Sequence, residues 1–271
     1  MSGLRHALRS RLPEPFLPVL RTIWGVGKRV PARLAWEVTP ARWRNARRIG
    51  QFRGRHQGER CFIIGNGPSL AGMDLSQLRH EVTFGLNRIY LLFPQMGFPT
   101  TYFVAVNELV VRQFRDEICS LPMPKFVSWF ARDVVPDCPD VVFVRDPKDD
   151  TFRFTRRPGL WVWECSTVTY VALQLAFYMG FRQVILVGVD HRFNTPGTPH
   201  ETVVSRSCDS NHFDPNYFGP GVRWQLPDLR SSERAYRLAL ETYVKAGRQV
   251  WDATVGGALE VFPKVPFESL F

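Results

Sequence analysis

Short apolar segments that end at a glycine or a polar residue recur through most of the chain, and they limit its fold more than any other feature. The segments are residues 61–65, 82–86, 102–106, 125–129, 141–144, 183–189 and 249–251. Runs of this kind are typical of strands that are buried on both faces of a sheet. Residues 167–180 and 232–246 instead place apolar side chains at helical spacing and lead into a glycine stop. The alternation predicts an α/β fold with a Rossmann-like, mostly parallel sheet and helices on both faces.

Positive charge is concentrated at the N-terminus of the 271-residue chain. Residues 1–60 contain 14 of the 35 Lys and Arg residues but only three of the 25 Asp and Glu residues. The remaining residues therefore hold 21 basic and 22 acidic groups, so they are close to neutral. We expect a basic, amphipathic, helical N-terminal arm over residues 1–58 and a Rossmann-like domain over residues 59–271. A neutral domain disfavours nucleic acid as the partner.

The predicted arm alternates apolar and cationic residues. Leu4, Leu8 and Trp24 lie among several arginines, and prolines divide the segment into short helical pieces. Such a segment can bind an anionic membrane surface through residues 1–50, since each Lys or Arg near anionic lipid contributes about 1 kcal/mol. The alternative is that the arm packs on the domain or on a second copy of the chain. RNA is disfavoured because aromatic stacking positions are sparse in the arm.

Three absences bear on the compartment. No apolar stretch approaches the roughly 20 residues of a membrane-spanning helix, and the N-terminus lacks a secretory apolar region with a small-residue cleavage site. The five cysteines are scattered and include no C-x-x-C pair, which fits reduced thiols better than disulfides or a structural zinc site. The sequence therefore predicts a cytoplasmic protein, which its arm would hold at the inner face of a membrane.

Glycines and polar residues follow successive predicted strands. They are the loop that starts at Gly65, then Asn87, Asn107, Ser166 and Thr167 at a helix start, and Asp190. The carboxyl ends of parallel strands share one edge of the sheet, where ligands bind in such folds. A single asparagine there can be a turn residue, but three at one edge favour a binding site.

Residues 65–70, Gly-Asn-Gly-Pro-Ser-Leu, join the first predicted strand to a helical turn. Gly65 and Gly67 allow a ligand to approach the backbone closely. Pro68 suits the first helical position, and Ser69 adds a hydroxyl where free N–H groups point outward, a geometry that binds phosphate. The segment matches neither G-x-G-x-x-G nor G-x-x-x-x-G-K-[ST]. We expect a phosphate or nucleotide site here, and a tight turn without a ligand is the alternative.

This hexapeptide resembles the opening motif of the bacterial sialyltransferases of glycosyltransferase family 42. It also resembles the MptE-like family, which is domain of unknown function 115. Residues 169–190 look like the second block that these families share, whereas residues 212–219 and 256–263 are more specifically similar to MptE-like proteins. The resemblance covers about residues 60–271 and implies a nucleotide-binding transferase domain. Sialyltransferases use a CMP-sugar, and the archaeal pterin members transfer diphosphate from ATP.

The resemblance implies a role for each polar residue at the sheet edge. The nucleotide or its sugar would be contacted by Asn66, Asn87, Asn107, Ser166 and Thr167. Asp190, together with His191, would hold an acceptor or ribose hydroxyl. The alternative for Asp190 is a helix cap or a hydrogen bond at the strand end.

His212 is the candidate general base. It lies in residues 209–214, Asp-Ser-Asn-His-Phe-Asp, whose carboxylates can orient an imidazole. Glycosyl transfer requires that the acceptor hydroxyl lose a proton, and a positioned histidine can accept it. The resemblance supports this role, since the sialyltransferases carry their base histidine in a similar segment. The alternative is a capping or solvent-facing histidine.

One segment departs from the sialyltransferase pattern. Those enzymes place tyrosines after the aspartate to stabilise the departing phosphate, but residues 190–200 contain none. His191, Arg192 or His200 would have to serve instead, through charge or hydrogen bonds. The departure leaves the donor sugar open and puts sialic acid in doubt.

Together these residues predict a glycosyltransferase that uses a nucleotide-activated sugar, with a CMP-sugar favoured, in surface-glycan assembly. Its acceptor would be a glycan or a lipid-linked glycan, which the arm would reach at the membrane. No D-x-D motif occurs, so neither a metal nor another cofactor is expected. The first alternative is a 6-hydroxymethylpterin diphosphokinase that uses ATP and Mg²⁺, with Asp190, Asp209 and Asp214 as candidate magnesium ligands. The second is a non-catalytic nucleotide-binding protein.

Overall fold

The structure is a computed structural model that describes residues 40–149, 151–159 and 161–271. The chain divides into two compact units, Met1–Asn45 and Ala46–Phe271, and the second unit contains the β-strands. Most of the predicted arm lies outside the described residues, so its membrane role stays a prediction. Ile49 and Phe52, which fall within the predicted arm, are buried in the core of the second unit.

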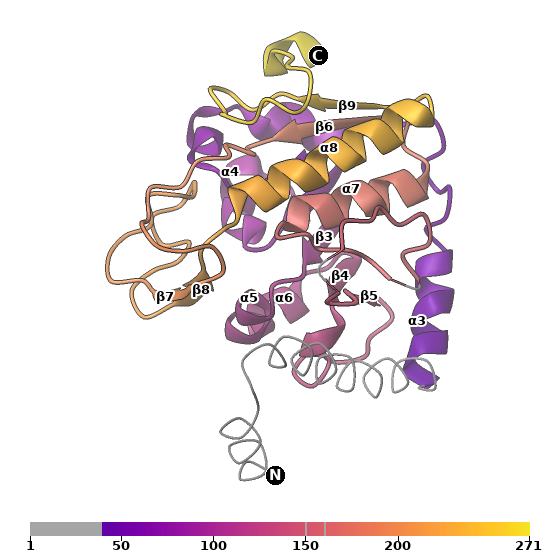
Figure 1. Ribbon diagram of the computed structural model, residues 1–271, viewed down its shortest axis with the longest axis horizontal. Coiled ribbons are helices and arrows are strands. Elements are labelled where there is room, and N and C mark those ends of the chain that lie inside the picture. Colours follow the sequence, from indigo (N-terminus) through magenta and orange to yellow (C-terminus); the bar gives the residue numbers. More distant parts are fainter. Residues whose placement is uncertain (1–39, 150, 160) are drawn as a thin grey trace, which may run out of the picture. The chain divides into compact units, whose positions relative to one another are not determined.

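A seven-stranded parallel sheet forms the centre of the second unit (Figure 1). Its strands are β1 (Arg60–Ile64), β2 (Val82–Leu86), β3 (Tyr102–Ala105), β4 (Lys125–Ser128), β5 (Val141–Val144), β6 (Gln183–Val187) and β9 (Gln249–Asp252). Their spatial order is β5-β4-β3-β2-β1-β6-β9, and every neighbouring pair is parallel. The predicted Rossmann-like parallel fold is confirmed. The strand order reverses between β1 and β6, which makes the crevice beyond their carboxyl ends the expected ligand site.

Helices cover both faces of this sheet. The α-helices are α3 (Pro40–Gly50), α4 (Phe93–Met96), α5 (Glu108–Gln113), α6 (Arg115–Ser120), α7 (Val168–Met179) and α8 (Leu229–Lys245). Short 3-10 helices complete the connections: η2 (Pro68–Gly72), η3 (Leu75–His80), η4 (Ile89–Leu92), η5 (Trp129–Ala131) and η6 (Phe267–Leu270). Helices α7 and α8 lie side by side on one face (Figure 1). The connections from β1 to β5 cross on the other face, as right-handed crossovers require. Within the described residues no helix combines the length and the apolar character needed to cross a bilayer.

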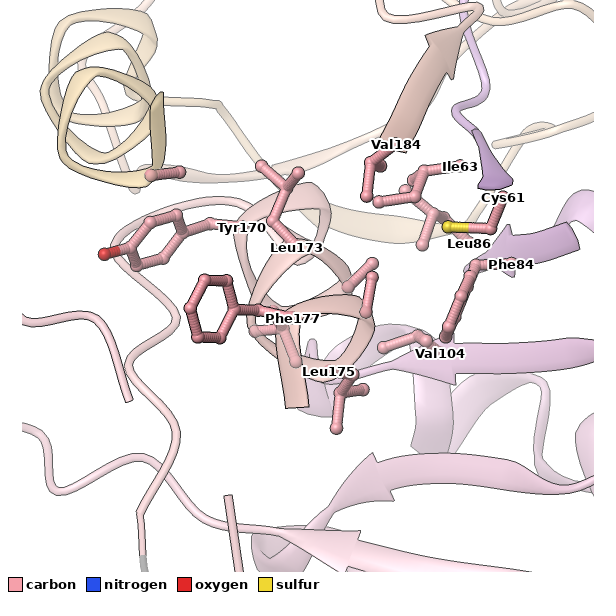
Figure 2. Packing of buried hydrophobic residues seen from close by; sticks show 14 of the residues in the cluster. Cys61, Ile63, Phe84, Leu86, Val104, Tyr170, Leu173, Leu175, Phe177 and Val184 are labelled. Carbon is pink, nitrogen blue, oxygen red and sulfur yellow. The ribbon is translucent and has the colours of Figure 1, made fainter. Parts of the chain in front are cut away.

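Helix α7 lies at the centre of the core because the sheet covers one side of it, whereas the neighbouring helix α8, Phe154 and Trp163 cover the rest. Leu173 and Leu175 are fully buried, and β1 and β2 contribute Ile63 and Phe84 to the same cluster (Figure 2). The hydroxyl of Tyr243 on α8 donates to the carbonyl of Leu173 at 2.7 Å. This cover explains why α7 is apolar around most of its circumference.

Residues 190–228 form the long connection between β6 and α8, and we call them the 190–228 segment. It contains a two-stranded antiparallel hairpin, β7 (Thr202–Val204) and β8 (Arg223–Gln225), which the sequence did not predict. Helix α8 then begins at Leu229, three residues before the predicted start, because the Asp228 side chain accepts from the N–H of Ser231. This cap fixes the end of the segment next to the sheet edge.

Replacement of Leu173 by alanine tests the buried position of α7. We expect Leu173→Ala to lower the free energy of unfolding by about 2–5 kcal/mol, because it leaves a cavity in a closed core. Val244→Ala on α8 is the control, since Val244 is 63% exposed. It should change the free energy by less than about 0.5 kcal/mol in the same urea titration. Equal effects of the two substitutions would contradict the burial of α7.

Candidate functional site

A cavity of about 690 Å³ lies at the carboxyl edge of the sheet. Five strands contribute to its wall through the residues that follow them: Asn66 after β1, Asn87 after β2, Asn107 after β3, Asp146 after β5 and Asp190 after β6. The start of α7 and the 190–228 segment complete the wall. The cavity therefore occupies the switch point at which ligands bind in open α/β sheets.

Most of the predicted site residues meet at this cavity. Those that line it are Gly65, Asn66, Gly67, Asn87, Asn107, Ser166, Thr167, Asp190 and His212. Pro68 and Ser69 do not line it. The convergence of these residues is a finding of the structure, whereas their contacts to a ligand stay predictions.

The glycine-rich loop after β1 is fastened to the loop after β6. The N–H of Gly67 donates to the carbonyl of Gly188 at 2.9 Å. Ser69 donates twice to the Asp190 carboxylate, from its N–H at 3.1 Å and from its hydroxyl at 2.7 Å. A Cβ on Gly67 would overlap that carboxylate, so this position requires glycine for an internal contact. The donors that the sequence assigned to a phosphate at Ser69 are bound by the carboxylate of Asp190 instead.

The three asparagines at the strand ends differ in what they bind. In the described part of the chain, the side-chain oxygens of Asn66 and Asn87 are buried and have no hydrogen-bond partner. The Asn107 oxygen instead accepts from the N–H groups of Leu109 and Val110 and caps α5. Buried polar atoms are rarely left unpaired, so Asn66 and Asn87 are the amides best placed to bind a ligand in the cavity.

Ser166 and Thr167 are bonded to α8 and to the start of α7. The Thr167 hydroxyl accepts from the N–H of Thr169 and contacts the hydroxyl of Tyr236 at 3.0 Å. The Ser166 hydroxyl donates to that of Ser231 at 3.1 Å. Both residues therefore have structural partners in addition to their place on the cavity wall.

Backbone strain is concentrated around the cavity. Among the described residues, the non-glycine positions with positive φ are Asn87, Lys148, Cys165, Ser166, His191 and His200. Every one of them lines the cavity. Left-handed backbone is costly for such residues and persists where the surrounding structure holds it, which is common at functional sites.

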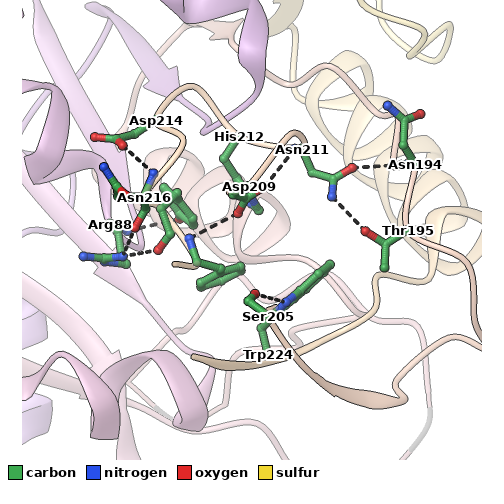
Figure 3. A network of polar contacts seen from close by, with 12 residues as sticks. Arg88, Asn194, Thr195, Ser205, Asp209, Asn211, His212, Asp214, Asn216 and Trp224 are labelled. Carbon is green, nitrogen blue, oxygen red and sulfur yellow. Dashed lines mark hydrogen bonds and ion pairs between the residues drawn. The ribbon is translucent and has the colours of Figure 1, made fainter. Parts of the chain in front are cut away.

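His212 is held by a hydrogen bond and by a stacked ring. Its Nδ1 lies 2.7 Å from Oδ2 of Asp209 (Figure 3), and its ring stacks on Tyr217 with centroids 3.9 Å apart. Only 10% of the His212 side chain is exposed, and Nε2 makes no hydrogen bond to any residue that the structure describes. Asp214, the other flanking carboxylate, accepts from the N–H of Asn216 instead. Asp209 is therefore the carboxylate that orients the imidazole.

Asp209 remains an anion although it is almost completely buried. Burial acts to raise its pKa, but the hydrogen bond and the charge of His212 outweigh this effect. The N–H groups of Asn211 and Phe218 also donate to the carboxylate. The net result is a lowered pKa for Asp209, which suits a group that holds the Nδ1–H of a histidine.

A second ionisable pair on the cavity wall was not predicted from the sequence. The ammonium of Lys148 donates to Oε2 of Glu164 at 2.9 Å. Burial raises the pKa of Glu164 to about 7, against the opposing effect of Lys148, and the charge of Asp146 adds to the rise. No motif surrounds Lys148 or Glu164, so only the folded chain reveals the pair.

The candidate magnesium ligands of the diphosphokinase alternative each have a hydrogen-bond partner within the chain. Asp190 is bonded to Ser69, Asp209 to His212, and Asp214 to the N–H of Asn216. Over the residues that the structure describes, no group of three or more His, Cys, Asp or Glu side chains is arranged to hold a metal ion.

Comparison with known proteins finds likeness in fold only. No family model and no curated protein matches the chain. The MAf glycosyltransferase from Magnetospirillum magneticum AMB-1 superposes with a TM-score of 0.51 and 16% identity over 86% of this chain. The sialyltransferase CstII from Campylobacter jejuni, in complex with cytidine-5'-monophosphate, gives a TM-score of 0.44 and 13% identity, over 77% of this chain and 85% of its own. The chain spans 40% of the length of the MAf protein and shares the fold of that part. The resemblance to MptE-like proteins stays a prediction.

Replacement of Gly67 tests the junction between the two loops. Gly67→Ala would force a methyl group against Asp190, and we expect a loss of about 1–3 kcal/mol in the free energy of unfolding. Gly72→Ala is the matched control, because nothing lies within 4 Å of a Cβ there. Urea unfolding should leave the control close to the unsubstituted protein, and similar losses for both would argue against the junction.

The raised pKa of Glu164 predicts a pH dependence of stability. Between its ordinary value of 4.5 and about 7, the folded chain retains a proton that the unfolded chain has lost. The contribution of Glu164 is therefore present below pH about 4.5 and is lost as the pH rises to about 7. Glu164→Gln should flatten the pH profile of the unfolding free energy in this window. Glu260→Gln, at an exposed position, should follow the unsubstituted protein, and parallel profiles for all three would refute the shift.

Proposed function

We propose that the chain is a glycosyltransferase that takes its sugar from a nucleotide-activated donor, with a CMP-sugar as the first candidate. The observation that carries the proposal is that His212, which is bonded to Asp209, lines the same cavity as Asn66 and Asn87, whose side-chain oxygens are unpaired in the described part of the chain. The cavity thus offers hydrogen-bond acceptors for a nucleoside and a general base for the hydroxyl that receives the sugar. The fold shared with the MAf glycosyltransferase supports the same class of reaction.

His212 serves as the general base in this proposal. Asp209 holds the proton on Nδ1, which leaves the lone pair of Nε2 to accept the proton of an acceptor hydroxyl. As that proton leaves, the acceptor oxygen bonds to the anomeric carbon of the sugar. The bond from this carbon to the phosphate oxygen breaks, and the electron pair stays on the nucleotide. Asp209 stabilises the imidazolium that results.

The departing phosphate requires positive charge or hydrogen-bond donors, and three side chains of the cavity wall supply them. His191 contacts Glu233 at 3.2 Å, the Arg192 guanidinium donates to the Gly256 carbonyl, and His200 lies 3.7 Å from Asp228. All three line the cavity near the end of β6. They take the place of the tyrosines of the sialyltransferases, so the donor sugar need not be sialic acid.

The setting proposed for this reaction is surface-glycan assembly at the inner face of a membrane. The basic arm of residues 1–50 would bring the chain to a lipid-linked or other glycan acceptor. No metal requirement is proposed, and the three candidate magnesium ligands, Asp190, Asp209 and Asp214, each accept hydrogen bonds from the chain itself.

Incubation with CMP-, UDP- and GDP-sugars, with and without EDTA, tests the proposal. Turnover of one sugar nucleotide that EDTA leaves unchanged is the expected result. His212→Ala should lower this turnover by roughly 10²–10⁴-fold while nucleotide affinity barely changes, because a base acts in the transition state. His80→Ala, at an exposed position outside the cavity, should be neutral. If ATP and hydroxymethyl-dihydropterin were the only substrates turned over, and EDTA abolished the reaction, the diphosphokinase would be established instead. Unaltered turnover in His212→Ala would show that His212 is not the general base.

A further inference from the structure

The ring of Tyr217 determines the plane in which His212 can lie. The two rings stack with an interplanar angle of 7° and centroids 3.9 Å apart. The hydrogen bond from Nδ1 to Asp209 fixes one point of the imidazole but permits rotation of the ring about that bond. The stacked tyrosine removes this freedom, so the direction of Nε2 depends on Tyr217 as well as on Asp209.

Tyr217 is held in turn by Arg88, the second residue after β2. The backbone N–H of Arg88 donates to the Tyr217 hydroxyl at 3.2 Å. Its guanidinium donates to the carbonyls of Tyr217 and Asn216 (Figure 3). The guanidinium also lies 3.8 Å from the ring centroid of Phe114 on the other side. Arg88 is 8% exposed, so its charge is desolvated and these contacts are expensive to break.

The residues that hold the His212 loop adjoin the amides that face the cavity. Arg88 directly follows Asn87, whose buried side-chain oxygen has no partner among the described residues and whose φ is 49°. Asn66 is the other asparagine whose buried side-chain oxygen has no partner among the described residues. Its backbone carbonyl accepts from the N–H of Phe213 at 3.0 Å. Two strand ends therefore connect the wall that would bind the donor to the loop that carries the imidazole.

We infer that Arg88 is a positioning residue that acts through Tyr217 to aim Nε2 of His212 at the acceptor hydroxyl. The inference rests on the proposed function, since it names what sets the geometry of the proposed base. A reacting atom displaced by about 1 Å can cost roughly 10²-fold in rate. Loss of the stack is therefore expected to lower turnover without removing any group that touches the donor.

Four substitutions separate the contacts that link Arg88, Tyr217 and His212. Tyr217→Leu removes the stacked ring, Tyr217→Phe removes only the hydroxyl, and Arg88→Ala removes the guanidinium but keeps the backbone N–H. Arg88→Lys retains the charge, but it cannot reproduce the contacts to the two carbonyls and Phe114 together. Arg112→Ala is the control, because Arg112 pairs with Asp133 at the surface and does not line the cavity.

The kinetic test measures kcat, the KM of the donor and the affinity for the nucleotide. We expect kcat to fall by about 10²-fold in Tyr217→Leu, about tenfold in Arg88→Ala and less in Arg88→Lys and Tyr217→Phe. The donor KM and nucleotide affinity should stay within about twofold. Because Arg88 acts through Tyr217, the double variant Arg88→Ala, Tyr217→Leu should lose no more than Tyr217→Leu alone. Additive losses, or losses that appear in donor affinity instead of kcat, would overturn the inference.

A second readout requires no turnover. Nitrogen-15 NMR of the imidazole should show His212 in its Nδ1–H tautomer in the unsubstituted protein and in Arg112→Ala. Because Asp209 still holds the proton on Nδ1, the tautomer should persist in Tyr217→Leu and Arg88→Ala. Nuclear Overhauser contacts between the His212 and Tyr217 rings should weaken in Arg88→Ala, and the His212 ring signals should broaden in Tyr217→Leu as the ring rotates about its bond to Asp209. If these changes occur and no sugar nucleotide is turned over, the positioning role stands and the proposed function fails. If the contacts between the two rings keep their intensity in folded Arg88→Ala, or in Arg88→Lys should Arg88→Ala not fold, the positioning role fails by itself.

Discussion

The fastening of the loop after β1 to the loop after β6 is the contact on which the site depends. At the switch point of a doubly wound sheet these loops diverge and leave a crevice between them. Here the N–H of Gly67 reaches the carbonyl of Gly188, and Ser69 closes on Asp190 through two hydrogen bonds. The absence of a side chain at Gly67 is what permits this approach. Because Asp190 occupies the N–H of Ser69, the unpaired side-chain oxygens nearest the cavity are those of Asn66 in the same loop and of Asn87 after β2.

The fold was predictable from the sequence because its signals are local. Each central strand is an apolar run long enough to be buried on both faces, so β2 and β5 have the predicted bounds. At the two largest differences from the predicted bounds, the end of β6 and the start of α8, a backbone or capping feature gives the reason. Strand β6 ends at Val187 rather than at residue 189, because Gly188 has a φ of 68° and turns the chain. The spacing of apolar residues in the sequence predicts neither that φ nor the Asp228 cap of α8.

The site was predictable only as a location. Residues that follow parallel strands must share an edge, which is why Asn66, Asn87 and Asn107 meet at one cavity, whereas His212 reaches it from the 190–228 segment. The sequence could not show which polar groups the protein itself would bind. Ser69 and Asp190 are 121 residues apart, and Lys148 and Glu164 meet only across a loop. Whether a polar group is bound by the protein itself or remains for a ligand depends on distances in the folded chain. Residue types alone do not reveal those distances.

The 190–228 segment supplies the candidate general base, which does not come from the edge of the parallel sheet. The sheet edge offers backbone N–H groups and short amides, whereas the candidate base comes from a segment that folds back over that edge. Two strand ends and one helix hold the segment: the Asn66 carbonyl accepts from the N–H of Phe213, Arg88 binds Tyr217, and Gln113 at the end of α5 pairs with the backbone of Arg223 at 2.7 and 2.9 Å. The position of His212 relative to Asn66 and Asn87 is therefore set by contacts to the ends of β1, β2 and α5. A base anchored in this way stays at a fixed distance from Asn66 and Asn87, even though its own segment contains little regular structure.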